Sequence, residues 1–316
     1  MSDAQTILVT GGCGYLGSQL IRELGAAPGR TVRILDNFQR PNHRALMNLP
    51  RAGRYQFIEG DILDPSVLEV ALHGVDGVVH LAAIVQTPLS FEEPQWTEQV
   101  NHWGTAHLVN ACIEAGVRRF VYASSTAAYG PGGPNSEADP CRPVGAYAQS
   151  KHHAEHVVLS GGTRGLAPTV LRLGSLFGLA PVVRFDAVAN RLAYLAGVGR
   201  ALTVYGDGSQ TRPLLHVRDA SNAICWAVER DAPPEGEVLN VASEDVSVAR
   251  LVQVIRETRP QARVHHTDQD IRTHFSFGAS SARIRALGWA PQVGLAEGMA
   301  ELIESFQGFA SPFGVG

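Results

Sequence analysis

The first half of the chain alternates short apolar runs with longer stretches whose apolar residues recur at helical spacing. Runs rich in β-branched or aromatic residues occur at positions 6–10, 32–35, 55–59, 77–81, 119–123 and 169–173. Bounded runs of this kind are typical of buried strands. Helical periodicity follows several of them, most clearly at 18–24 and 96–116. Strands that alternate with helices predict an α/β fold with a doubly wound parallel sheet.

A glycine-rich turn joins the first predicted strand to the first predicted helix. Gly11 suits a tight turn, Gly14 lets the backbone approach a pyrophosphate at the helix N-terminus, and Gly17 allows close packing of helix on strand. The second strand ends in Asp36, whose carboxylate would accept hydrogen bonds from a ribose diol and repel a 2′-phosphate. The pattern predicts NAD as the cofactor, and Arg40 nearby keeps NADP as an alternative.

Three further polar or small sites lie where the parallel sheet should open. Asp61 follows the third strand, where it would contact an adenine amino group or cap a helix. Ala82 and Ala83 close the fourth strand, and small residues there either let a ribose approach or simply pack tightly. Asn101 lies in the long predicted helix, where an inward amide needs partners and would hold a neighbouring backbone.

Tyr147 and Lys151 are four residues apart in a segment that reads as a helix. That spacing puts both side chains on one face. An ammonium beside a phenol favours the phenolate, so we expect a lowered pKa and a tyrosine able to transfer a proton near neutral pH. The pair alone would also fit a half-buried helix whose lysine reaches solvent. The fifth strand ends in Ser124, Ser125 and Thr126, and a hydroxyl there could bind the oxygen on which Tyr147 acts.

Composition narrows the class of protein. The chain has 316 residues, of which 45% are hydrophobic and 18% charged, with a net charge of -4. It is long enough for a full core and a second lobe, and the absence of a basic run argues against nucleic acid as a partner. No apolar stretch predicts a membrane span, and no signal peptide is evident. Four scattered cysteines indicate reduced thiols in a cytoplasmic protein, and the dispersed histidines predict no metal site.

The motifs TGGCGYLGS, ILDN, GDI, HLAA, ASSTAAYG and YAQSK occur in this order. Together they resemble the extended short-chain dehydrogenase/reductase family, in its NAD-dependent sugar epimerase/dehydratase branch. The resemblance implies a Rossmann-type doubly wound parallel sheet with a smaller C-terminal substrate-binding lobe, and a homodimer formed by the helices around 96–116 and 147–159. It places the catalytic triad on Ser125, Tyr147 and Lys151, with Thr126 as the close alternative to the serine. The predicted cofactor-binding residues are Gly11, Gly14, Tyr15, Leu16, Gly17, Asp36, Asn37, Asp61, Ile62, Leu81, Ala82, Ala83, Asn101, Tyr147 and Lys151.

The second half is expected to supply the substrate site. Residues 1–174 would form the NAD-binding domain, with parts of 206–245 returning to it, and 175–316 mainly the substrate lobe. Ser175 stands where relatives carry asparagine, and Asn190 faces either the substrate or solvent. The segment GDGSQTR resembles a diphosphate-binding segment of nucleotide-sugar enzymes and ends in Arg212, with Arg272 as the second arginine. Substrate contacts are therefore predicted at Ser125, Thr126, Ser175, Asn190, Arg212 and Arg272.

The residues beside Ser125 favour one reaction. The 4,6-dehydratases of this branch carry aspartate and glutamate where this chain has Thr126 and Ala127, and the sugar-acid decarboxylases carry a glutamate in the same block. The best match is an NAD-dependent nucleotide-sugar 4-epimerase that works through a 4-keto intermediate. The alternatives are a dehydrogenase or reductase of a sugar nucleotide or other small alcohol, and a non-enzymatic NAD-binding sensor.

Overall fold

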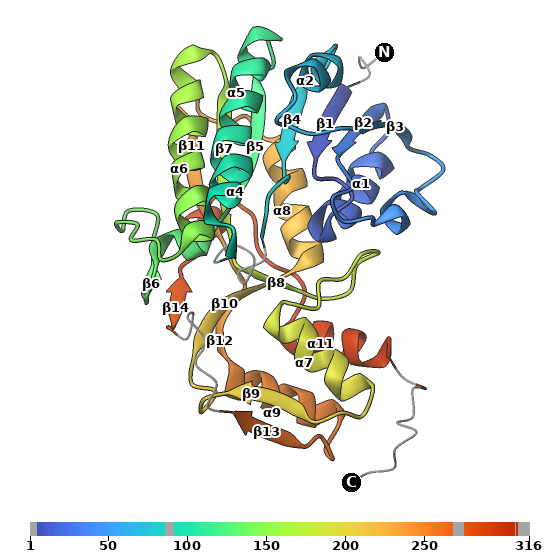
Figure 1. Cartoon of the computed structure of the whole chain (residues 1–316), viewed down its shortest axis with the longest axis vertical. Coiled ribbons are helices and arrows are strands. Elements are labelled where there is room, and N and C mark those ends of the chain that lie inside the picture. The colour runs from blue at the N-terminus through green and yellow to red at the C-terminus, as the bar shows by residue number, and fades with distance from the viewer. Residues whose placement is uncertain (1–4, 86–91, 268–274, 307, 309–316) are drawn as a thin grey trace.

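A seven-stranded parallel sheet forms the centre of the N-terminal body (Figure 1), in the order β11-β7-β5-β4-β1-β2-β3. The computed structural model describes residues 5–85, 92–267, 275–306 and 308. The strand order runs outward in both directions from β1 and β4, as in doubly wound folds, so the predicted fold class is confirmed. The strands are β1 (Gln5–Thr10), β2 (Arg30–Asp36), β3 (Arg54–Glu59), β4 (Gly77–His80), β5 (Arg119–Ser125), β7 (Ala167–Leu173) and β11 (Glu237–Val241).

Helices cover both faces of this sheet because its strands are apolar on both sides. From β1, Ile7 and Val9 pack in the same core cluster as Leu20 and Ile21 of the first helix, whereas Leu8 belongs to the core on the opposite face. One face carries α1 (Tyr15–Ala26) and α8 (Val217–Glu229), and the other carries α2 (Pro65–Leu72), α5 (Gly104–Glu114) and α6 (Ala146–Ser160). The N-terminal body thus takes one strand and one helix from beyond residue 206.

The remaining elements form the C-terminal lobe and the connections to it (Figure 1). Its strands pair as β12-β10-β8 and β13-β9, and a separate pair, β14-β6, lies beside them. Its core contains Leu192, Ile255 and Leu302, one from each of the three long helices of the lobe. These elements are β8 (Ser175–Phe177), α7 (Val188–Gly197), β9 (Leu202–Tyr205), β10 (Thr211–His216), β12 (Glu244–Ser247), α9 (Val248–Thr258), β13 (Val264–Thr267) and α11 (Leu295–Glu304). The short ones are η1 (His43–Leu46), η3 (Thr126–Tyr129), β6 (Gly132–Asn135), η4 (Gly161–Arg164), β14 (Phe277–Ala279) and α10 (Ala282–Ala286).

Two predicted helices differ from the observed ones. The helix expected over 96–116 consists of α4 (Pro94–Glu98), a π-helical turn at η2 (Gln99–Trp103) and α5. The amphipathic pattern over 246–258 predicts a helix, and the observed helix begins at Val248, because Val246 and Ser247 pair in β12 and the Ser247 hydroxyl accepts a hydrogen bond from the Arg250 amide at 3.1 Å. Among the described residues, no helix is long and apolar enough to cross a membrane. All four cysteines are free thiols.

Candidate active site

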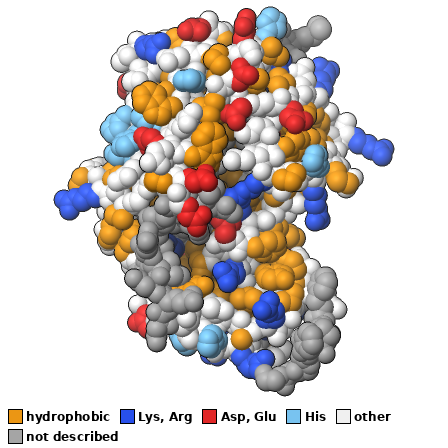
Figure 2. Space-filling model, viewed as in Figure 1, with side chains coloured by type: hydrophobic (Ala, Val, Ile, Leu, Met, Phe, Trp, Pro, Cys, Tyr) orange, Lys and Arg blue, Asp and Glu red, His pale blue; other side chains and the backbone are white. Residues whose placement is uncertain are grey.

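A cavity of about 1140 Å³ opens at the carboxyl ends of the central strands, between the sheet and the C-terminal lobe. Acidic and basic side chains gather at the boundary between the two parts on the face shown in Figure 2. Parallel pairing sets Thr10 beside His80, so the turns after β1 and β4 lie side by side at the point where the strand order reverses. This is the position at which open α/β sheets bind ligands.

The glycine turn at one end of the cavity leaves no room for side chains. Gly11 has φ +70°, and a Cβ there would lie 2.6 Å from the Ala82 nitrogen. A Cβ on Gly17 would lie 2.4 Å from the Gly11 oxygen. Helix α1 starts directly after Gly14 with no side-chain cap, so its first amides face the cavity end. Bare backbone at a helix N-terminus fits the diphosphate of a dinucleotide.

Two carboxylates border the same end of the cavity. Asp36 accepts hydrogen bonds from the Cys13 amide at 2.8 Å and the Phe38 amide at 3.0 Å. Asp61 accepts a hydrogen bond from the Asn37 side chain at 2.8 Å and from the Leu63 amide at 2.9 Å. Burial raises the pKa of Asp36, although the hydrogen bonds from these two amides act in the opposite direction. The loop amides therefore hold both carboxylates at the cavity wall, where the nucleoside part of a dinucleotide would lie.

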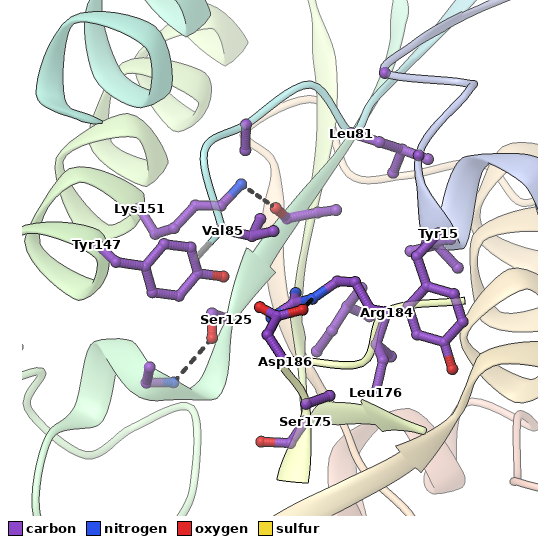
Figure 3. A pocket seen from close by; sticks show the side chains of 18 of the residues that line it. Tyr15, Leu81, Val85, Ser125, Tyr147, Lys151, Ser175, Leu176, Arg184 and Asp186 are labelled. Carbon is purple, nitrogen blue, oxygen red and sulfur yellow. Dashed lines mark hydrogen bonds and ion pairs between the residues drawn. The ribbon is translucent and has the colours of Figure 1, made fainter. Parts of the chain in front are cut away.

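Ser125, Tyr147 and Lys151 converge on the cavity from β5 and α6 (Figure 3). Ser125 accepts a hydrogen bond from the Ala127 amide at 3.2 Å, which fixes its hydroxyl beside the phenol. Lys151 is the only lysine in the chain, and the other 25 of its 26 lysine and arginine residues are arginines. Its ammonium donates to the Ala123 oxygen at 2.8 Å and lies 4.7 Å from the centre of the Tyr122 ring.

The structure corrects the expected proton affinity of this pair. Burial raises the pKa of Tyr147, while the hydrogen bond with Ser125 and the charge of Arg184 oppose that rise. Burial also lowers the pKa of Lys151 to about 7, against the opposing charge of Glu155. A half-charged lysine cannot hold the phenol strongly ionised. The net pKa of Tyr147 is therefore raised by burial, opposite to the expected direction, and a lowering effect of Lys151 on the phenol stays a prediction.

A buried ion pair fixes α6 against the sheet just behind the triad. Arg172 donates to Glu155 twice, from Nε at 2.9 Å and from Nη2 at 2.6 Å. The same carboxylate accepts from the Ser124 hydroxyl at 2.5 Å. Arg172 also lies over the Tyr129 ring, 4.7 Å from its centre. These contacts join the ends of β5 and β7 to the helix that carries Tyr147.

Three predicted contact residues do not line the cavity. Asn101 is buried, and its amide binds both backbone groups of Ile84 and the Ser150 hydroxyl, at 2.8, 2.9 and 3.0 Å. Thr126 is buried and donates to the Leu173 oxygen at 3.2 Å. Asn190 is also buried. The prediction that these residues contact a ligand directly is therefore corrected. Their polar groups are already paired inside the protein, so they support the structure of the site.

Asn190 instead fixes the loop between β8 and α7. Its side chain accepts from the Gly178 amide at 3.0 Å and donates to the Arg184 oxygen at 2.9 Å. It also bonds the Tyr15 hydroxyl at 3.2 Å, and that hydroxyl donates to the Gly178 oxygen at 2.6 Å. Tyr15 therefore lines the cavity with its ring while its hydroxyl ties the glycine turn to this loop.

The other predicted residues within the described part of the chain all line the cavity: Gly11, Gly14, Tyr15, Leu16, Gly17, Asp36, Asn37, Asp61, Ile62, Leu81, Ala82, Ala83, Ser125, Tyr147, Lys151, Ser175 and Arg212. Their individual roles stay predictions. Arg212 reaches the cavity from β10, with its guanidinium 4.7 Å from the Phe277 ring centre and bonded to the Phe275 oxygen. Burial lowers the pKa of Arg212 to about 10. Arg272 lies outside the described residues.

Sequence reasoning missed Arg184 and Asp186. Both line the cavity from the loop that precedes α7. They form a two-point ion pair, Nε to Oδ1 and Nη2 to Oδ2, each at 2.9 Å. The only signal in the sequence was two opposite charges, two residues apart, in the otherwise apolar stretch from Leu179 to Val188.

The chain belongs to the NAD dependent epimerase/dehydratase family, whose sequence profile matches residues 7–242. It is an NAD-dependent enzyme of the extended short-chain dehydrogenase/reductase type. Mouse dTDP-D-glucose 4,6-dehydratase is 30% identical over 323 residues, covering 97% of this chain and 90% of that protein. MoeE5 in complex with UDP-glucose and NAD is 31% identical with a TM-score of 0.83, over 95% of this chain and 97% of that one. The UDP-glucose 4-epimerase of Thermotoga maritima, with UDP-glucose, is 26% identical with a TM-score of 0.86, over 96% and 98% of the two chains.

Proposed function

We propose that the protein is an NAD-dependent nucleotide-sugar 4-epimerase. Relatives named as dehydratases, decarboxylases and epimerases all match it, so the family leaves the reaction open. The observation that carries the proposal is Ala127 at the cavity wall beside Ser125 and Tyr147. A triad without a neighbouring proton-transfer carboxylate has what epimerisation needs and lacks what elimination needs.

The residues of the triad divide the work. Tyr147 removes the proton from the C4 hydroxyl, and Ser125 donates a hydrogen bond to the same oxygen as it becomes a carbonyl. NAD, which the glycine turn and Asp36 would hold, would supply the acceptor and donor for the C4 hydride. Tyr147 then gives the proton back to the oxygen, so that the reaction has no net redox change. Lys151 lies one helical turn from Tyr147 and, in its protonated form, places a cation at the back of the site.

The carboxylates near the reacting end do not suit dehydration. Thr126 points inward to the Leu173 oxygen and Ala127 has no acidic group. Asp186 does line the cavity, but both of its oxygens accept hydrogen bonds from Arg184. A general acid must carry a proton on an oxygen that can reach the leaving group. A ligand that displaces this pairing would release Asp186, so the support for epimerisation over loss of the C6 hydroxyl comes from Thr126 and Ala127.

The test is turnover of nucleotide hexoses in D₂O, followed by NMR and by absorbance of NADH. An epimerase gives the C4 epimer with hydrogen, not deuterium, at C4, because the same hydride returns. It also gives no net NADH. Net NADH formation or consumption would identify a dehydrogenase or reductase, and solvent deuterium at C5 together with loss of the C6 hydroxyl would identify a dehydratase. Either result would contradict the proposal.

The proposed substrate is a nucleotide-diphosphate sugar, with Arg212 on the diphosphate. A planar guanidinium that lies against two aromatic rings is a rigid donor for phosphate oxygens. Solved relatives bind a neutral sugar nucleotide, UDP-glucose, or an acidic one, UDP-glucuronic acid. The charge of the sugar is therefore left open by the family.

We also propose a homodimer that pairs α4, η2 and α6, in a cytoplasmic protein. Trp103 is 56% exposed on this face. It borders a shallow groove together with Pro94, Ala146 and His153. A large exposed aromatic beside Pro94 and Ala146, with polar residues around them, is typical of an interface. Light scattering of the wild type and of Trp103→Arg tests this, since a dimeric wild type and a monomeric variant are expected.

A further inference from the structure

Arg184 and Asp186 stand in the middle of the cavity, between Ser125 and Tyr147 on one side and Tyr15 on the other (Figure 3). The charge of Arg184 is felt at both phenols, since it opposes the raised pKa of Tyr147 and that of Tyr15. The guanidinium thus lies at the reacting end of the cavity. Arg212 lies elsewhere, on β10 and against the rings of Phe275 and Phe277.

The backbone under this ion pair is fixed. The Arg184 carbonyl accepts from Asn190 at 2.9 Å, and the Val182 amide donates to the Ser18 hydroxyl at 3.2 Å. Asn190 is fully buried, and it bonds in turn to the Tyr15 hydroxyl. The loop is therefore tied both to α7 and to the first helix, and Arg184 is held in place before any ligand arrives.

The ion pair itself leaves part of the guanidinium available. Nε and Nη2 bind Asp186, whereas Nη1 makes no hydrogen bond with another described residue. The side chains of Arg184 and Asp186 are 27% and 28% exposed. An ion pair that water reaches contributes little net free energy, so a ligand held by other contacts displaces it readily. Asp186 thus pairs with Arg184 in the free protein, and a ligand can replace Asp186 in this pair.

We propose that Arg184 binds a carboxylate of the sugar, so that the substrate is a nucleotide-linked hexuronic acid. The inference rests on the proposed function, in which Tyr147 acts at C4. In a hexopyranose, the carbon next to C4 bears the exocyclic C6 group, whereas the diphosphate is attached at C1, across the ring. A cation beside the phenol therefore meets the C6 substituent and not the diphosphate.

The chemistry of the pair favours a carboxylate over a hydroxyl at C6. The guanidinium fork matches the two oxygens of a carboxylate, and a hydroxyl offers only one acceptor. A carboxylate ligand replaces Asp186 on Arg184 with a group of the same kind, so the arginine keeps its charge compensated. A neutral hexose would gain nothing from breaking the pair. Ser175, which also lines this part of the cavity (Figure 3), offers a second donor to the same group.

The experiment measures binding rather than turnover, so that it does not depend on which reaction follows. A UDP-hexuronate and the UDP-hexose of the same configuration are titrated into NAD-loaded Tyr147→Phe protein by calorimetry. In this Tyr147→Phe background, the further substitution Arg184→Gln should weaken binding of the hexuronate by about 20-fold or more and binding of the hexose by less than about threefold. Arg184→Lys should recover part of the loss. Arg200→Gln, at an exposed arginine after α7, is the matched control and should change neither.

The Asp186→Asn variant provides an independent test of the carboxylate site. Removing the competing negative charge should increase the affinity for the hexuronate severalfold and leave the affinity for the hexose unchanged. Equal losses for the two sugars in Arg184→Gln, no loss for either, or weaker hexuronate binding in Asp186→Asn would overturn the inference. Thermal melting and NAD binding of each variant verify that it is folded.

The two proposals fail separately. If the wild type epimerises a UDP-hexose and the Arg184 variants do not discriminate between the sugars, the proposed function stands and the carboxylate site is wrong. If the variants discriminate in binding but no C4 epimer forms from either sugar, the carboxylate site stands and the proposed function is wrong.

Discussion

The ammonium of Lys151 donates a hydrogen bond to the carbonyl oxygen of Ala123 at 2.8 Å. This contact turns the only lysine of the chain toward the end of β5, into surroundings that disfavour its charge. An arginine at this position would not behave in the same way, because a guanidinium stays charged at neutral pH even when it is buried. Lys151 is therefore a group whose charge depends on its surroundings in the site.

The pKa of Lys151 can be measured directly. Lysine labelled with ¹³C at Cε gives a single lysine signal, because the chain has one lysine. We expect that signal to titrate near the pKa of about 7 that burial imposes, and to vanish in Lys151→Met. A titration midpoint near 10.5, the value for an exposed lysine, would contradict the buried environment.

The same shift predicts how stability changes with pH. The pKa of Lys151 is lowered on folding from 10.5 to about 7, so between these values the unfolded chain binds more protons than the folded one. Stability from this group therefore rises with pH from 7 to 10.5, by about 1.4 kcal/mol per pH unit. Below pH 7 the penalty is complete and constant. Urea unfolding at pH 7, 8 and 9 should show this slope in the wild type relative to Lys151→Met.

Tyr147→Phe should abolish turnover and leave NAD binding intact. The substitution removes the hydroxyl that transfers the proton and keeps the ring, and such a loss lowers kcat by a factor of about 10³ or more. Tyr55→Phe is the matched control, since its buried hydroxyl has no partner among the described residues and Tyr55 does not line the cavity. A Tyr147→Phe enzyme with near wild-type kcat would remove Tyr147 from the mechanism.

Asp36→Ala should weaken NAD and relax the preference against NADP. Asp36 lines the cavity after β2, and Arg40 lines it nearby. Losing the carboxylate removes a hydrogen-bond acceptor for the ribose and a repulsion of the 2′-phosphate, so NAD should bind about tenfold more weakly and NADP no worse. Fluorescence titration with both nucleotides measures the ratio. The exposed Glu69→Ala on α2 serves as the control, and a ratio unchanged in Asp36→Ala would exclude Asp36 from the nucleoside site.

Arg212→Ala should weaken a nucleotide-diphosphate sugar far more than NAD. The guanidinium reaches the cavity from the lobe, away from the glycine turn, so its loss should cost the sugar nucleotide about 1.5–3 kcal/mol, or roughly 10- to 100-fold. Calorimetry with UDP and with NAD separates the two effects. Equal weakening of both ligands would show that Arg212 supports the structure of the cavity and does not bind a diphosphate.

Local sequence features were enough for much of this protein. The six strands expected in the first 174 residues are all present in the parallel sheet, because buried β-branched runs and glycine turns carry their own conformational preference. The glycine turn, Asp36, Ser125, Tyr147 and Lys151 all line one cavity, since the carboxyl ends of parallel strands meet at one edge. Motif order and spacing identified the family.

Tertiary structure decided what depends on distance between distant segments. The sequence could not assign partners to Asn101, Thr126 and Asn190, whose polar groups turn out to be bound inside the protein. It could not give the sign of the pKa shift of Tyr147, because burial competes there with the hydrogen bond to Ser125 on β5 and the charge of Arg184 in the loop before α7. Nor could it bring Arg184 and Asp186 beside the triad. Local conformation depends on residues that are neighbours in the sequence, whereas long-range hydrogen bonding, burial and electrostatics depend on all the residues that the fold brings close.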